Sequence, residues 1–159
     1  MTYAVRASLI SLALLVALVT PTLASTTSSF VGTFRETFGR GNAPSGVGSV
    51  AGMGLATESF LFTDSTPDDG CFLDGGITTI SFADGDVVLR EDNRLCTPGG
   101  SGQAPGSQVS YGNPVTWTGT YTITGGTGAY AGATGAGTAA GQLAGDTIVI
   151  RYNGTITLP

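Results

Sequence analysis

The sequence contains no histidine and no lysine, and these two absences narrow the chemistry that the chain can perform. Histidine is the usual general base, the usual activator of a serine or cysteine nucleophile and the commonest metal ligand. Its absence excludes serine-triad, histidine-paired cysteine and histidine-ligated zinc chemistries. Any acid–base work would fall to carboxylates, tyrosines or a thiol.

Positive charge is also scarce, because six arginines face eleven carboxylates and the formal net charge is -5. An acidic chain without a basic patch repels phosphate backbones and anionic lipid headgroups, so we expect neither a nucleic-acid partner nor a membrane-surface role. The aspartate-rich stretch 64–70 (DSTPDDG) lacks the DxDxDG spacing of a calcium loop. We therefore predict no metal site and no cofactor.

A long apolar run occurs in one place, at the start of the chain. Residues 1–24 contain Arg6, an apolar core over 9–19 and Thr22-Leu23-Ala24 before Ser25, which is the pattern of a secretory signal peptide cleaved after Ala24. The alternative is an uncleaved anchor, but the core is shorter than the about 20 residues of a membrane span. We expect residues 25–159 to form one secreted or periplasmic domain without a membrane span.

Cysteine is rare, with Cys71 and Cys96 as the two in the chain. In an exported protein the oxidising compartment favours a disulfide between them. The alternative, a catalytic thiol, lacks an activating partner such as histidine.

Strand alternation is strongest at 116–124 (TWTGTYTIT), where every even position is threonine and the odd positions hold larger or apolar residues and one glycine. A period of two indicates a strand with one face buried. Stretch 147–158 alternates in the same way, and the glycines of 125–128 predict a turn between extended segments.

About eight extended segments, with no helix beyond the signal, predict an all-β fold: a single antiparallel barrel of about eight strands, in preference to a sandwich. Asp84-Gly85 predicts a type I′ hairpin between strands 77–82 and 87–91. We expect 46–57 to be one extended segment, 64–70 a turn, and 97–114 a long exposed loop whose order stays open.

The stretch GTYTI (119–123) followed by GGTGAYAGATG (125–135) resembles the GGTG-aromatic-x-G-A-x-G segment of the allene oxide cyclase-like and dirigent-like β-barrels. That group includes small exported bacterial members of unassigned role, and the resemblance covers about the last third of the chain. It implies a barrel that holds an apolar substrate inside without a cofactor, either to cyclise an allene oxide or to guide the coupling of phenoxy radicals. No catalytic residue is carried over from it.

Alternation alone selects the residues that would face the barrel interior: Phe34, Glu36, Trp117, Tyr121 and Tyr152. Either they pack the core or they line a ligand site, since eight-stranded barrels are often filled by side chains. Glu36 falls on an aromatic face and must be paired, hydrogen-bonded or neutralised there, unless a bulge turns it outward.

Inward glycines at 32, 119 and 154 are expected to leave gaps that form a small pocket near one end. The function that we expect is an exported barrel that binds a small apolar or aromatic ligand, or an interaction module. The alternative is a cyclase- or isomerase-like enzyme in which Glu36, with Tyr121 or Tyr152, polarises a substrate. The lack of histidine and lysine favours the first, and the oligomeric state stays open.

Overall fold

The computed structural model describes residues 24–38, 43–96 and 115–159. Nearly all of the expected signal peptide, and the whole of the expected loop 97–114, lie outside the described residues. Among the described residues, no helix is long and apolar enough to cross a membrane.

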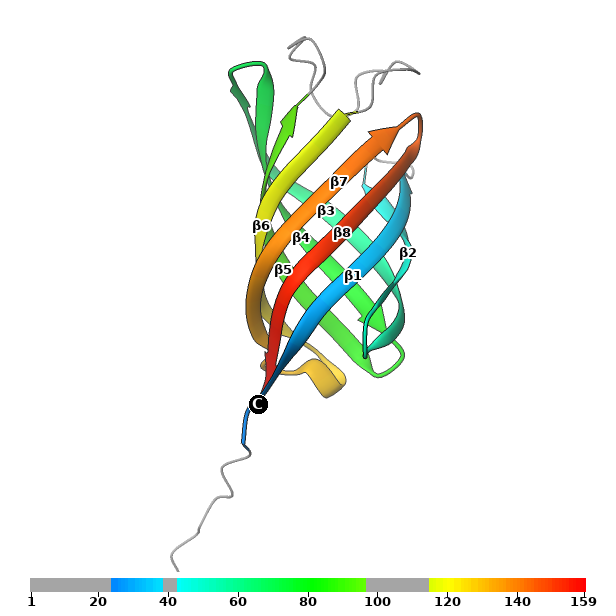
Figure 1. The fold of residues 1–159 in the computed structure, drawn as a ribbon, viewed down its shortest axis with the longest axis vertical. Helices are drawn as coiled ribbons and strands as arrows, with labels where there is room; N and C mark the ends of the chain where they lie inside the picture. Colours follow the sequence, from blue (N-terminus) through cyan, green and yellow to red (C-terminus); the bar gives the residue numbers. More distant parts are fainter. Residues whose placement is uncertain (1–23, 39–42, 97–114) are drawn as a thin grey trace, which may run out of the picture.

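Eight antiparallel strands follow one another around a closed barrel in chain order (Figure 1). They are β1 (Thr26–Phe38), β2 (Pro44–Val50), β3 (Gly54–Asp68), β4 (Cys71–Phe82), β5 (Gly85–Cys96), β6 (Val115–Gly126), β7 (Thr134–Ala144) and β8 (Thr147–Leu158). A 3-10 helix, η1 (Gly128–Tyr130), connects β6 and β7. Pairing of β1 with β8, from Thr26↔Leu158 to Thr37↔Thr147, closes the ring. The predicted all-β barrel of about eight strands is confirmed.

Two of the expectations about turns that were wrong concern β3. Stretch 46–57 is not one segment, because the chain turns at Ala51–Met53, where Gly52 has a φ of 78° and Gly54 a φ of 103°. Stretch 64–70 is not all turn, because β3 continues to Asp68. The turn is confined to Asp69 and Gly70, with φ values of 42° and 75°, which are the two positive angles of a type I′ hairpin.

The predicted hairpin of β4 and β5 is present, but its turn differs from the expected one. Phe82 pairs with Gly85, so the connection is Ala83-Asp84 and not Asp84-Gly85. Neither connecting residue has a positive φ, so the turn is not type I′. Gly85 is needed for another reason: a Cβ there would lie 2.1 Å from the carbonyl oxygen of Thr127.

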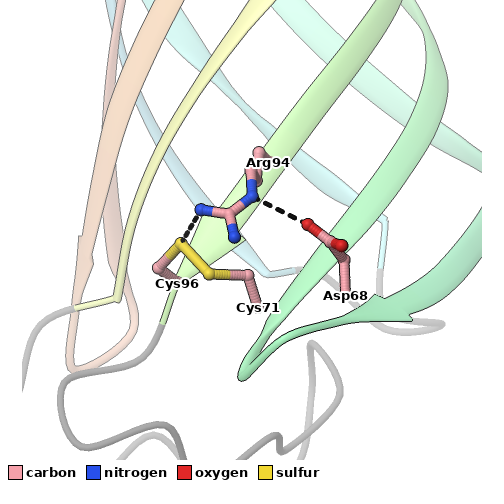
Figure 2. The surroundings of a disulfide bond; sticks show 4 residues. All are labelled: Asp68, Cys71, Arg94 and Cys96. Atoms are coloured by element: carbon pink, nitrogen blue, oxygen red, sulfur yellow. Dashed lines mark hydrogen bonds and ion pairs between the residues drawn. A yellow bond between two sulfur atoms is a disulfide. The ribbon is translucent and has the colours of Figure 1, made fainter.

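The Cys71–Cys96 disulfide is confirmed, and Figure 2 shows its surroundings. The two cysteines are direct partners in the β4–β5 register, with their Cα atoms 4.3 Å apart, so the bridge joins the outer ends of that hairpin. Beside it, Arg94 Nε lies 2.9 Å from Asp68 Oδ2, and Arg94 Nη1 donates to Cys96 Sγ at 3.2 Å. The contacts tie β3, β4 and β5 together beyond the barrel wall.

The two ends of the barrel differ in composition. We call the end near the C-terminus and η1 the base half (Figure 1). Its buried side chains include Phe30, Ile80, Val87, Ile123, Tyr130 and Ile156. At this end η1 packs on the β4–β5 turn, where Tyr130 Oη donates to Asp84 Oδ1 at 3.0 Å and the Tyr130 ring lies 5.1 Å from that of Phe82. The opposite end, towards the disulfide, is the mouth half. The base half is an apolar core.

Candidate functional site

All five residues expected inside the barrel face inward. Phe34, Glu36, Tyr121 and Tyr152 are buried, and Trp117 is half-buried against the core. No bulge turns Glu36 outward, since it pairs in regular register with Gly46 and Ile148. Whether these residues contact a ligand stays a prediction.

The expected gaps at the inward glycines are filled by neighbouring side chains. Gly32, Gly119 and Gly154 face inward as predicted, but a Cβ at Gly154 would lie 2.4 Å from Tyr121 Oη and one at Gly119 would lie 2.1 Å from Asn93 Oδ1. The pocket argument from missing side chains was therefore wrong, because long neighbours reach across the space that each glycine leaves.

Three glutamates lie inside the barrel, on three different strands. Glu36 (β1), Glu58 (β3) and Glu91 (β5) are 4%, 3% and 0% exposed. We call them the carboxyl cluster. Glu36 and Glu58 both pair with Gly46 of β2, which lies between them and has no side chain to separate their carboxyl groups. Alternation of the strands therefore concentrates acidic groups where burial is deepest.

Tyr152 links two members of the carboxyl cluster. Its hydroxyl oxygen lies within hydrogen-bonding distance of Glu58 Oε1 and 2.8 Å from Glu91 Oε1. Glu91 also accepts hydrogen bonds from Thr78 Oγ1 and, at 3.0 Å, from Asn93 Nδ2. The result is a continuous buried network across β3, β4, β5 and β8.

The positions of the protons in this network follow from how many protons its groups can donate. A tyrosine hydroxyl has one proton, so it donates to one carboxyl oxygen at a time. Glu91 has three donors around it and therefore fits the ionised form, with Tyr152 as one of them. The contact between Tyr152 and Glu58 then needs a proton on Glu58 Oε1, which Glu58 donates to the Tyr152 hydroxyl oxygen. Glu58 is thus neutral and Glu91 negative.

The electrostatics agree with a neutral Glu58. Burial, with the neighbouring charge of Glu36, raises the pKa of Glu58 well above its usual value. Burial, together with the charge of Glu91, raises the pKa of Glu36 to about 7 and that of Tyr121 to about 12. Burial and the two adjoining glutamates raise the pKa of Tyr152 well above 10.0. Near neutral pH Glu36 can hold or release a proton.

Several buried polar atoms inside the barrel have no hydrogen-bond partner among the described residues: Glu36 Oε1, Glu58 Oε2, Asp74 Oδ1 and Oδ2, Asn93 Oδ1 and Tyr121 Oη. Native proteins leave few such atoms, and each calls for an explanation. Nor does a described cation offset the acidic groups, because Arg35, Arg90, Arg94 and Arg151 are all exposed on the outer face.

Half-buried aromatic rings accompany the cluster towards the mouth. Phe60 and Phe62 continue the inward face of β3 beyond Glu58, with ring centroids 4.7 Å apart, and Trp117 lies on β6. The mouth half therefore combines acidic groups with partly accessible aromatic surface.

Sequence reasoning missed four members of this network: Glu58, Thr78, Glu91 and Asn93. Strand alternation could have found the two glutamates, because residues two apart point to the same face of a strand. Glu58 shares its face with Phe60, and Glu91 shares its face with Leu89. Thr78 and Asn93 carry no comparable signal, because threonine and asparagine are ordinary on either face of a strand.

Comparison with known proteins places the chain in no family. No family model, no curated protein and no solved structure matches it. Within the described ranges, no group of three or more acidic or cysteine side chains is arranged to hold a metal ion.

Proposed function

We propose that this protein is an exported barrel that binds a small, mainly apolar or aromatic molecule in its mouth half, without a cofactor. The unpartnered buried atoms of Glu36, Glu58, Asn93 and Tyr121 carry the proposal. A ligand with a polar group would complete their hydrogen bonding, and its apolar body would cover the half-buried rings of the mouth half. The disulfide supports export, because such bridges persist in oxidising compartments.

The resemblance to the allene oxide cyclase-like and dirigent-like barrels supports the same class of ligand and stays a prediction. An interaction module on the outer face is the weaker reading. Its exposed apolar side chains, Val47, Leu55 and Leu61 among them, give no indication of a partner.

A pKa of about 7 at Glu36 favours a second candidate, a cyclase- or isomerase-like enzyme. A general acid or base works best when its pKa is near the working pH, and the buried Glu36 Oε1 has no hydrogen-bond partner among the described residues. A bound ligand recovered unchanged supports binding alone. Conversion that is lost in Glu36→Gln supports the enzyme.

The binding proposal is tested by titrating the protein with nitrobenzene, a neutral aromatic quencher. Trp117 is the one tryptophan of the chain, so its fluorescence reports on the mouth half. We expect saturable quenching, and we expect Phe60→Ala to weaken the affinity about tenfold, equivalent to about 1.4 kcal/mol. The matched control is Leu61→Ala, the next residue on β3, which faces outward and is 63% exposed. Quenching that rises without saturation, alike in both variants, would contradict the proposal.

A further inference from the structure

The carboxyl cluster holds a negative charge that no described residue balances. Three donors surround Glu91, whereas the described arginines all lie on the outer face. A carboxylate without a cationic partner costs several kcal/mol to bury. A cation bound inside the barrel would offset this cost, and an anion would increase it.

The unpartnered atoms next to this charge can all accept hydrogen bonds. Glu36 Oε1, Asn93 Oδ1 and both carboxyl oxygens of Asp74, the register partner of Asn93, are acceptors. Glu58 Oε2 is the carbonyl oxygen once the proton lies on Oε1, and the Tyr121 hydroxyl can donate as well as accept. An organic ammonium group has three donors and no acceptor, which matches the acceptors of this set. A neutral alcohol has one donor and would leave acceptors unpaired.

Aromatic rings provide a second feature suited to a cation. Phe60, Phe62 and Trp117 are half-buried in the mouth half, and the hydroxyl of the buried Tyr152 contacts the cluster directly. The faces of such rings attract cations within about 6 Å and also bury apolar surface. An apolar or aromatic body attached to the ammonium group would fit against them.

We propose that the ligand of the mouth half is an organic primary amine, bound as its ammonium ion with the nitrogen among Glu36, Glu58 and Asn93 and the charge balanced by Glu91. This inference rests on the proposed function and deepens it by naming the class of ligand. The apolar or aromatic part of the amine covers Phe60, Phe62 and Trp117.

The pH dependence of binding follows from the groups that face the interior. The titratable ones are Glu36 (β1), Glu58 (β3), Asp74 (β4), Glu91 (β5), Tyr121 (β6) and Tyr152 (β8). The inward positions of β2 and β7 hold no titratable side chain. Acidification protonates Glu36, whose pKa burial raises to about 7, whereas an alkyl ammonium stays charged, so amine binding weakens as the pH falls.

The test compares phenethylamine with phenethyl alcohol by calorimetry on the full protein. These probes differ in one group, an ammonium or a hydroxyl. We expect the amine to bind about tenfold more tightly at about pH 8, equivalent to about 1.4 kcal/mol, and the difference to become smaller at about pH 5, where Glu36 is protonated. Glu91→Gln should reduce the preference and keep alcohol binding. Asp92→Asn removes the same charge from the exposed face of β5 and should leave the preference intact.

The outcomes separate this inference from the function on which it rests. Equal binding of both probes to the native protein would overturn the amine and leave the binding function standing. Binding of neither would overturn both. Loss of the preference in Asp92→Asn as well would attribute it to net charge and overturn the assigned site. If Glu91→Gln fails to fold, the pH comparison on the native protein decides, and a preference unchanged at about pH 5 overturns the inference.

Discussion

At the scale of single residues, the Tyr152 hydroxyl is the group whose removal should most disturb the buried polar network. It joins Glu58 to Glu91 in a part of the barrel where all three side chains are 3% exposed or less. Removing the hydroxyl leaves Glu58 Oε1 without a described partner and leaves Glu91 Oε1 with Thr78 alone. The penalty of such a change exceeds the net gain of an ordinary hydrogen bond.

We expect Tyr152→Phe to lower the free energy of unfolding by about 1–3 kcal/mol, measured by urea denaturation. Tyr121→Phe is the matched control. That ring is also buried in the interior, and its centroid lies 5.6 Å from that of Tyr152, but its hydroxyl has no described partner. Its removal should be close to neutral. Equal losses in the two variants would contradict the proton assignment.

At the scale of elements, the β4–β5 hairpin is held at its outer end by two features of unequal strength. The disulfide closes a loop with a sequence separation of 25, and the Arg94–Asp68 ion pair joins side chains that are 46% and 41% exposed. Solvent screens the ion pair, so the covalent bridge should contribute most of the stabilisation.

Replacing both cysteines with serine is expected to cost on the order of 2–5 kcal/mol, seen as a lower melting temperature. Asp68→Asn removes the ion pair alone and should cost less than about 1 kcal/mol. If the two variants melt at the same temperature, the hairpin end does not depend on its disulfide.

Sequence alternation predicted the strands well where one face is apolar, as in β6 and β8. The predicted bounds of the final strand, residues 147 to 158, are those of β8. It failed at β3. The polar residues of its outer half resemble a turn, but pairing of Asp64 with Gly75 and of Asp68 with Cys71 holds them extended. An Asp-Gly pair does form a type I′ turn, at Asp69-Gly70 and not at Asp84-Gly85.

The candidate site was less predictable than the strands, because it depends on how the strands are arranged around the ring. Parity indicates that Glu36 faces inward, and the same reasoning would have included Glu58 and Glu91. Nothing along the chain indicates that Tyr152, which is 94 residues from Glu58, contacts it. That contact exists because β8 closes against β1.

At the scale of the whole molecule, stability should decrease as the pH rises, contrary to ordinary acid denaturation. Glu36 has a pKa of about 7 in the folded barrel and 4.5 as its reference value, so the folded state binds the proton more tightly. Its contribution is fully present below the unfolded pKa and is lost as the pH rises through the folded pKa. Glu58 acts in the same direction.

We expect the free energy of unfolding to fall between about pH 5 and about pH 8 by about 3 kcal/mol for Glu36 alone, at 1.36 kcal/mol per pKa unit. Urea denaturation across this range measures it. Glu36→Gln should flatten the slope, because glutamine does not titrate. A native barrel that becomes more stable over this interval would show that Glu36 is not held neutral by burial.

Closure of the barrel also determines when the fold can be completed. β1 has one partner, β2, that follows it closely in the chain, but its other partner is β8, and the pair Thr26↔Leu158 spans nearly the whole domain. During synthesis the last strand is made last, so until then β1 and β7 both have an unpaired edge. Bringing such distant segments together is slow, and exposed strand edges can associate with other chains. We therefore expect the form in which residues 147–158 are still unpaired to be the one most prone to associate with other chains.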